Sequence, residues 1–307
     1  MKNLRASIDI GSNSTLLLAG NYQNGKFEEL ANESRITGLG RGLDIDKAFI
    51  PEAMSDGLEA LKEYSAICVK LGIKPEDVIV TATEASRVAR NAKDYFAKIK
   101  KETGLNIQTI TSDAEAYYSA RGVLFDPLIK DKTIYIMDIG GASTEIIEVE
   151  TKPFKIIRSI SLPMGAVRMT SWLKEKNNLD KVEEIFTKFS DISSYKTKKL
   201  FCVAGTMTSI GNMYLGHSEF VEKEVNLLEL TSKDLNNVVE KYFPIAEADI
   251  LKKFPFLGKR SRTIHGGMLV AKTVCDKLAV EKIVISTYGL RYGTLIEGVI
   301  KHEFLFK

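Results

Sequence analysis

The 307-residue sequence holds few of the residues that build disulfide frameworks or zinc sites, with three cysteines and three histidines. Cys68, Cys202 and Cys275 are odd in number, lie far apart, and each occupies an apolar stretch. This pattern predicts reduced core thiols and a cytoplasmic location, because paired cysteines belong mainly to oxidising compartments. A Cys/His zinc site is not expected from so few scattered ligands.

No apolar run reaches the roughly 20 residues that a membrane-spanning helix needs, so we expect no membrane partner. The N-terminal MKNLRASIDIG has no apolar segment before its first aspartate and does not resemble a secretion signal. A formal net charge of +3 is too small to argue for a nucleic-acid partner, and none is expected. The dinucleotide motif G-x-G-x-x-G after a strand and the P-loop motif G-x-x-x-x-G-K-S/T are both absent, which disfavours those two folds.

The length predicts two domains, given about 100–200 residues per domain. Strand-like and helical apolar patterns alternate along the chain, which indicates an α/β protein. Asn24-Gly25 predicts a tight turn between two strands. Residues 216–260 have a mostly helical, polar pattern, and a last helix is expected over Tyr292–Phe304. We expect one domain over residues 1–124, completed by 291–307, and a second over 125–290.

One short motif occurs twice in the same frame. Asp9–Thr15 reads D-I-G-S-N-S-T, and Asp138–Thr144 reads D-I-G-G-A-S-T. Each copy follows a strand-like apolar run and continues into another, so each is predicted to be a strand, a tight polar turn and a second strand. Such a turn suits phosphate, because glycine permits close approach and successive backbone N–H groups form an anion-binding concavity. Two unrelated hairpin turns are the alternative, which the shared frame disfavours.

A third turn, Val203–Ser209, reads V-A-G-T-M-T-S and leads from a strand into a helix. The free N–H groups at such a helix start favour a phosphate. A plain helix cap would have the same sequence, so this turn by itself carries less weight.

At these motifs the sequence resembles the exopolyphosphatase / guanosine pentaphosphate phosphohydrolase (Ppx/GppA) family of the actin-like ATPase superfamily. The resemblance spans nearly the whole chain and extends to ATEASR at 82–87, TSDAEA at 111–116, SLPMGAVR at 161–168, KRSR at 259–262 and YGLR at 288–291. It implies an α/β protein with two ribonuclease-H-like (actin-like ATPase) domains flanking an interdomain cleft.

The resemblance also implies hydrolysis of terminal phosphoanhydride bonds. The expected substrates are inorganic polyphosphate, which would release orthophosphate, and pppGpp, which would become ppGpp. Glu115 is then the general base that activates water, and Glu145 is a second catalytic carboxylate. Mg²⁺, with Mn²⁺ as the alternative, is expected on Asp138, Glu145 and Asp9. The phosphate-binding residues implied are Ser12, Asn13, Ser14, Arg87, Gly140, Gly141, Ala142, Ser143, Thr144, Gly205, Thr206 and Thr208.

Two other functions stay open from the sequence. The first is an ATP-using kinase of the same fold, against which Glu115 argues because it matches a hydrolase motif. The second is a non-catalytic sensor of ppGpp or polyphosphate, supported by Ala142 and Ala114 where the family carries glycine and an acid. For a lone arginine such as Arg87, an ion pair is the commoner role. A homodimer is an expectation that no motif specifies.

Overall fold

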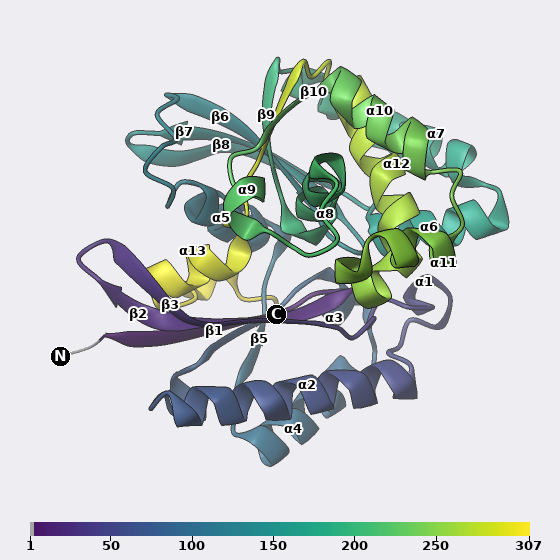
Figure 1. Ribbon diagram of the computed structural model, residues 1–307. Coiled ribbons are helices and arrows are strands. Elements are labelled where there is room, and N and C mark those ends of the chain that lie inside the picture. Colours follow the sequence, from purple (N-terminus) through teal and green to yellow (C-terminus); the bar gives the residue numbers. More distant parts are fainter. Residues whose placement is uncertain (1–2) are drawn as a thin grey trace. The chain divides into compact units, whose positions relative to one another are not determined.

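The structure, a computed structural model, describes residues 3–307 (Figure 1). The chain divides into two compact units. Unit 1 comprises the chain up to Phe125 together with Leu290–Lys307, and unit 2 comprises Asp126–Gly289. The divisions expected from the sequence each lie one residue away from these boundaries.

Unit 1 contains a five-stranded sheet with the order β3-β2-β1-β4-β5. Its strands are β1 (Leu4–Ile10), β2 (Ser14–Gln23), β3 (Lys26–Ile36), β4 (Ile79–Ala82) and β5 (Ile107–Thr109). The first three strands are antiparallel, whereas β1, β4 and β5 run parallel. Asn24 and Gly25 have φ values of 53° and 73°, which confirms the tight turn expected between β2 and β3.

Helices cover both faces of this sheet. They are α1 (Leu43–Asp46), α2 (Pro51–Lys70), α3 (Glu84–Val88), α4 (Ala92–Thr103), α5 (Ser112–Val123) and α13 (Leu290–Glu297). Figure 1 shows α2 and α4 on one face and α5 and α13 on the other. Tyr64 of α2 and Tyr95 of α4 are buried in the same core as Ile8 and Val80 of the sheet. This packing is the one that an amphipathic helix over a half-apolar sheet produces.

The C-terminal segment does not form the helix expected over Tyr292–Phe304. Instead, α13 ends directly before Gly298, whose φ of 76° is the left-handed conformation that commonly stops a helix. A short 3-10 turn then spans His302–Phe304, and Leu305 forms an antiparallel bridge with Ile110 beside β5. That prediction was therefore wrong beyond α13, because pairing near the sheet edge replaces the last helical turns.

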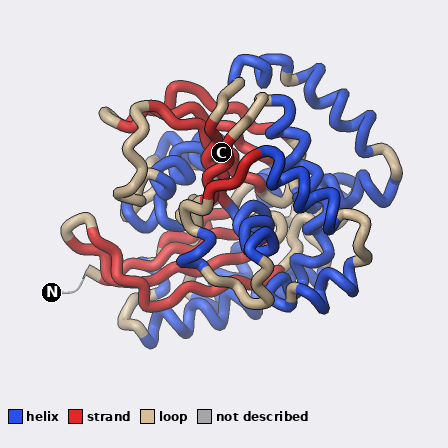
Figure 2. Tube along the Cα trace, turned by 45° about the horizontal axis from the view of Figure 1, so that its top comes forward, coloured by secondary structure: helices blue, strands red, loops and turns tan. Residues whose placement is uncertain are grey.

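Unit 2 contains a six-stranded sheet with the order β10-β11-β9-β6-β7-β8. Its strands are β6 (Thr133–Ile139), β7 (Thr144–Thr151), β8 (Phe154–Leu162), β9 (Lys199–Val203), β10 (Glu229–Thr231) and β11 (Lys282–Ile285). The order β8-β7-β6-β9-β11 repeats that of unit 1, and Figure 2 shows the strands of each unit as red tubes lying side by side.

The added strand β10 lies inside residues 216–260, which were expected to be mostly helical. It has three residues, too few to show a strand period. Its buried Leu230 pairs with Ile283 of β11, so a long-range contact fixes this strand rather than a local preference.

The helices of unit 2 surround this sheet. They are α6 (Ala166–Glu175), α7 (Asn178–Lys188), α8 (Ala204–Leu215), α9 (Glu222–Val225), α10 (Ser232–Tyr242), α11 (Glu247–Lys253) and α12 (Ser261–Lys277). Met207, Phe254 and Met268 are buried at the centre of their core. The expected α/β fold class, with two sheet-based units, is confirmed.

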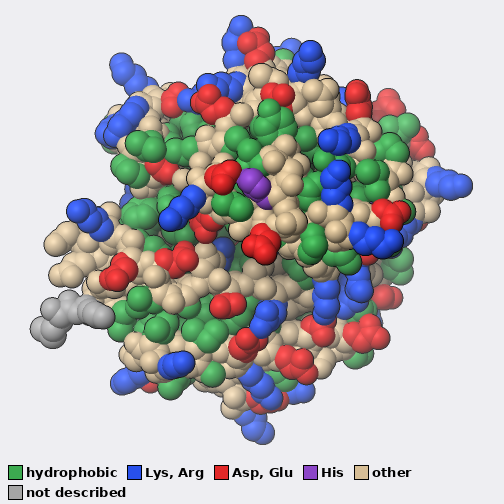
Figure 3. All heavy atoms as spheres, viewed as in Figure 1, with side chains coloured by type: hydrophobic (Ala, Val, Ile, Leu, Met, Phe, Trp, Pro, Cys, Tyr) green, Lys and Arg blue, Asp and Glu red, His purple; other side chains and the backbone are tan. Residues whose placement is uncertain are grey.

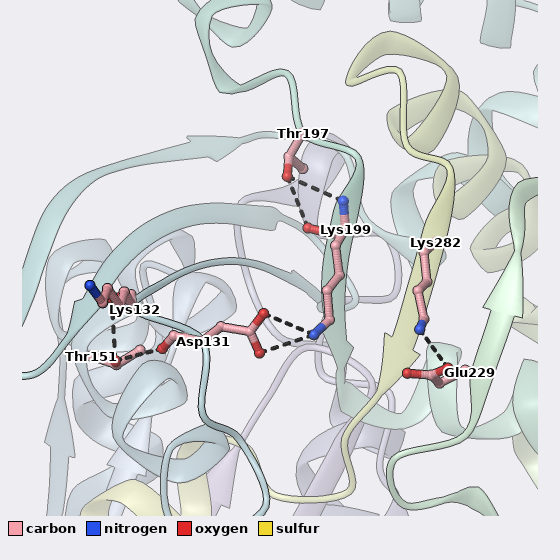
Figure 4. A network of polar contacts seen from close by, with 7 residues as sticks. All are labelled: Asp131, Lys132, Thr151, Thr197, Lys199, Glu229 and Lys282. Atoms are coloured by element: carbon pink, nitrogen blue, oxygen red, sulfur yellow. Dashed lines mark hydrogen bonds and ion pairs between the residues drawn. The ribbon is translucent and has the colours of Figure 1, made fainter.

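Two parallel strands of unit 2, β9 and β11, each begin with a lysine that forms an ion pair (Figure 4). Lys199, the first residue of β9, lies 3.0 Å from both carboxylate oxygens of Asp131. Lys282, the first residue of β11, contacts Glu229 at 2.6 Å. Both parallel strands thus begin at surface ion pairs, and the turn over Val203–Ser209 follows the opposite end of β9.

The face drawn in Figure 3 carries charges of both signs. Figure 3 shows Lys and Arg interspersed with Asp and Glu over the face in view, in keeping with the net charge of +3. Among residues 3–307, the structure contains no helix that is both long and apolar enough to cross a bilayer.

Candidate active-site residues

The repeated motif forms the same hairpin in each unit. The first turn, residues 11–14, joins β1 to β2, and the second turn, residues 140–143, joins β6 to β7. Gly11 N donates to Ser14 O at 2.9 Å, and Gly140 N donates to Ser143 O at 3.0 Å. The hairpins expected from the shared sequence frame are therefore present, closed by equivalent hydrogen bonds.

The carbonyl groups of the first turn are held by the loop over residues 38–42. Gly38 N donates to Asn13 O at 2.9 Å, and Gly40 N donates to Ser12 O at 2.6 Å. Ser12 is buried beneath this loop. A Cβ atom on Gly40 would lie 2.9 Å from the Cβ of Ser12, so glycine is what lets the loop approach the turn.

The carbonyl groups of the second turn are held by the start of α6. Gly140 O and Gly141 O accept from the first two backbone N–H groups of that helix, at 2.9 and 2.8 Å. The guanidinium of Arg168 donates to Ala142 O at 2.5 Å. A Cβ on Gly165 would come within 2.5 Å of the Gly141 backbone, so this junction also requires glycine.

These carbonyl contacts orient the backbone N–H groups. In a planar trans peptide the C=O of one residue and the N–H of the next point in opposite directions. The N–H groups of Asn13 and Ser14 therefore point away from the loop that supports the first turn. Those of Gly141, Ala142 and Ser143 point away from α6. Each turn thus presents successive N–H groups on one side, the arrangement that binds anions such as phosphate.

The carboxylates beside the turns differ between the units. Asp9 of β1 lies opposite Leu16, whereas Asp138 of β6 lies opposite Glu145. Residues directly opposite each other on antiparallel strands project from the same face of the sheet. The second hairpin therefore places two carboxylates together, and the first has one.

Glu145 is almost completely buried, with 3% of its surface exposed. It lies opposite Ser161 of β8, and the Ser161 hydroxyl donates to Glu145 Oε1 at 2.7 Å. A carboxylate is costly to remove from water unless hydrogen bonds replace its hydration. This contact is one of those that hold the Glu145 side chain in place.

Two further predicted residues meet in unit 1. Arg87 of α3 and Glu115 of α5 form an ion pair, with 2.5 Å between Nη1 and Oε1. Their side chains are only 13% and 10% exposed, and the same Nη1 donates to Ile110 O at 2.6 Å. An adjacent guanidinium offsets the cost of burying a carboxylate. The expected general base and the expected phosphate-binding arginine are thus direct neighbours.

The sheet topology explains why these residues gather. β1, β4 and β5 are parallel, and the first turn, Arg87 and Glu115 follow their respective carboxyl ends. Thr83 N donates to Ile10 O at 3.2 Å, which ties the end of β4 to the end of β1. The carboxyl ends of parallel strands are where open α/β sheets bind ligands.

The third turn begins α8 at the carboxyl end of β9. Ala204 has a φ of 70°, and the preceding Val203 caps the helix with no side-chain hydrogen bond. The guanidinium of Arg260 packs over Gly205, and a Cβ at that glycine would overlap it. An arginine beside the N–H groups of a helix start gives this turn a second feature suited to an anion.

Three predicted hydroxyl groups lie against the protein itself. Thr144 Oγ1 donates to Met164 O at 2.5 Å, and Thr208 Oγ1 donates to Ala204 O at 3.3 Å within α8. The side chain of Thr206 packs against Gly267 of α12. The phosphate-binding role expected of these three residues stays a prediction.

The carboxylates of the second hairpin suit a magnesium ion better than they suit a metal ion that takes all its ligands from the protein. Within residues 3–307, no group of three or more His, Cys, Asp or Glu side chains is arranged to hold a metal. Mg²⁺ usually takes one or two carboxylates and completes its shell with water and substrate phosphates. The Asp138 and Glu145 pair beside a phosphate-type turn meets that requirement.

Sequence reasoning missed the residues that support the turns. Arg168 and Gly165 were noted only as part of a motif, and the glycine loop over 38–42 was not singled out. Ser161 carried no assigned role. Glycines spaced by two in 38–42 were a possible signal for a close backbone approach. The partner of Ser161, by contrast, depends on strand register.

Together, two sheets of matching order, each opened by a phosphate-type hairpin, define an α/β protein of the actin-like ATPase class. The model of the Ppx/GppA phosphatase family matches residues 20–302, and the chain belongs to that family. A solved structure of the Ppx/GppA family member from Aquifex aeolicus is 25% identical, with a TM-score of 0.77 and 96% of each chain covered.

Two curated relatives are similar over most of the chain. The bifunctional 3-dehydroquinate synthase/phosphatase of Fusobacterium nucleatum is 31% identical over 96% of the chain. The chain spans 46% of that longer relative. Exopolyphosphatase 2 of Mycobacterium tuberculosis is 24% identical, with 94% of the chain and 96% of the relative covered.

Proposed function

We propose that the chain hydrolyses terminal phosphoanhydride bonds. The substrates are inorganic polyphosphate, from which it releases orthophosphate, and pppGpp, which it converts to ppGpp. Family membership and a relative of matching length that is named an exopolyphosphatase support this reaction. The observation that carries it is the second hairpin, where Asp138 and Glu145 lie opposite each other beside a turn that presents three backbone N–H groups.

In the proposed mechanism, the backbone N–H groups of each turn bind phosphate oxygens, and the Arg87 guanidinium of unit 1 compensates phosphate charge. Such fixed donors stabilise a transferred phosphoryl group without reorganising during the reaction. Glu115 accepts the proton of the attacking water. Asp138 and Glu145 would hold Mg²⁺, or Mn²⁺. The metal supplies charge neutralisation on the phosphate oxygens.

The test is phosphate release from polyphosphate, pppGpp and ATP, each with Mg²⁺ and with Mn²⁺. Glu115→Gln and Glu145→Gln each remove a carboxylate while keeping its shape, and each is expected to lower turnover by about 10²–10⁴-fold. Asp113→Asn and Glu150→Gln are matched controls on α5 and β7, and both should retain wild-type turnover.

The outcomes separate the alternatives. Faster release from ATP than from the other two substrates would indicate a kinase-like relative. Tight binding of ppGpp or polyphosphate without any phosphate release would indicate a sensor. Near wild-type turnover in both glutamine variants would show that the carboxylates are wrongly assigned.

We also propose a cytoplasmic location and a homodimer. Three free, buried thiols are in keeping with a reducing compartment. Sedimentation of the intact chain measures the oligomeric state, and a single species at 34.2 kDa would exclude the homodimer.

A further inference from the structure

Because the motif is repeated, the contact between Ser161 and Glu145 can be compared with the equivalent pair of residues in unit 1. In unit 2, Glu145 on β7 lies opposite Ser161 on β8. In unit 1, the equivalent residue Leu16 lies opposite Ser34. Ser34 is exposed and faces an apolar side chain, whereas Ser161 is partly buried and donates to a carboxylate. The same register therefore produces a polar pair in unit 2 alone.

We propose that Ser161 is a positioning residue for the catalytic carboxylate Glu145. This inference rests on the proposed function and adds a residue to it. Ser161 touches neither substrate nor metal in this proposal. It acts through its 2.7 Å hydrogen bond to Oε1 of Glu145. Holding that oxygen in place also fixes the direction in which the other carboxylate oxygen points.

The energetic argument concerns orientation. A buried carboxylate oxygen that loses its hydroxyl donor loses part of the hydrogen bonding that replaces its hydration. The Glu145 side chain would then sample more rotamers. A smaller fraction of the enzyme would hold the carboxylate in place, so turnover falls.

The primary variant is Ser161→Ala. We expect kcat to fall about tenfold, equivalent to about 1.4 kcal/mol, with KM changed little. Ser161→Thr keeps the hydroxyl and suits a strand, so it should restore kcat. A purely structural role would lower the amount of folded protein and leave the kcat of the folded fraction unchanged.

Two controls are matched by position. Ser159→Ala lies two residues away on the same strand and opposite the apolar Ile147. Ser34→Ala lies at the repeat-equivalent place in unit 1. Both should keep wild-type kcat. In a Glu145→Gln background, Ser161→Ala should have little further effect, because the two residues act as one pair.

A measurement without substrate separates this inference from the proposed function. Glu145 is observed at one fixed pH by NMR of its ¹³C-labelled carboxyl group, whose resonance is assigned by its loss in Glu145→Gln. A resonance that moves or broadens in Ser161→Ala and returns in Ser161→Thr supports the positioning role, even if wild-type protein releases no phosphate and the proposed reaction fails. Identical resonances and identical kcat values in wild type and Ser161→Ala would overturn the inference, while an inactive Glu145→Gln would leave the proposed function standing.

Discussion

The two hairpins share a backbone and differ in chemistry. Both are closed by a glycine N–H to a serine carbonyl, and both follow an aspartate near the end of a strand. The first has Leu16 opposite its aspartate, and the second has Glu145. The comparison teaches that the phosphate-binding geometry belongs to the repeated backbone, whereas the second carboxylate is a single side-chain difference on that backbone.

The supports of the two turns also differ. In unit 1, the glycine loop over residues 38–42 donates hydrogen bonds to the turn. In unit 2, the start of α6 and the Arg168 side chain donate them. Both supports bind the outward carbonyl groups, and both turn the N–H groups to the other side. Unrelated local structures can therefore orient the same turn, provided that they offer hydrogen-bond donors at the same places.

Of the effects that these comparisons predict, the largest is the loss of turnover when a support of a turn is changed. Gly165→Ala would place a Cβ 2.5 Å from the Gly141 backbone, and backbone atoms cannot move aside without displacing the second turn. We expect turnover to fall by about 10²-fold, since small displacements of reacting groups have effects of that order. Gly40→Ala meets the Ser12 side chain at 2.9 Å and should cost about tenfold or less. Kinetics of phosphate release measure both, and equal losses would contradict this ranking.

A second comparison concerns helix packing in the two units. Gly293 of α13 packs so closely on α5 that a Cβ would overlap the Tyr118 carbonyl, whereas at Gly266 of α12 the Cβ would meet Ala166 O at 2.5 Å. Gly293→Ala should lower the free energy of unfolding of unit 1 by roughly 2–3 kcal/mol. Gly266→Ala should cost unit 2 less.

Urea denaturation can follow the two units separately. Trp172, the one tryptophan of the sequence, lies in unit 2, so its fluorescence reports that unit while circular dichroism reports both. Gly289→Ala is the control, because its Cβ would have 3.8 Å to the nearest atom. A fluorescence midpoint lowered more by Gly293→Ala than by Gly266→Ala would refute the assignment to separate units.

The smallest expected effect compares two helix caps. Thr231 and Asp234 form a complete capping box on α10, whereas Thr111 caps α5 with Ala114 at the corresponding position. Hydrogen bonds from Thr231 lower the pKa of Asp234 below its usual value. A carboxyl whose pKa is lowered by folding stabilises the protein above its unfolded pKa, about 3.9, and loses that contribution as the pH falls further.

Asp234→Ala should therefore cost about 1 kcal/mol at pH 7 and less below about pH 4. Thr111→Ala removes a cap that lacks this carboxylate, so its cost should vary less over the same range. Urea midpoints at a series of pH values measure both differences. A cost of Asp234→Ala that stays constant into acid would show that the carboxylate contributes nothing through its charge.

The sequence predicted the parts of the fold that local patterns encode. The two copies of one seven-residue motif predicted both hairpins, and Asn24-Gly25 predicted the turn between β2 and β3. The three-residue strand β10 could not be found, because only its pairing with β11 defines it. The end of α13 was also missed, since Gly298 stops the helix and the following residues return to the sheet.

The contacts of the candidate residues were less accessible from sequence. That Glu145 meets Ser161 depends on the register of β7 against β8, and those strands shift register at Glu148/Val149. That Arg87 pairs with Glu115 depends on α3 and α5 following neighbouring parallel strands. Residue types and spacing indicated which side chains carry chemistry, but tertiary structure decides which of them touch. The roles assigned to these residues stay predictions until the variants are measured.

The three buried thiols allow the unfolding of each unit to be followed separately. Burial raises the pKa of Cys68 to about 11 and of Cys275 to about 12, and it raises that of Cys202 as well. A thiol that is both covered and protonated reacts with alkylating reagents only when its surroundings unfold. Mass spectrometry of the labelled peptides would thus time the exposure of unit 1 through Cys68 and of unit 2 through Cys202 and Cys275, with no engineered probe in the chain.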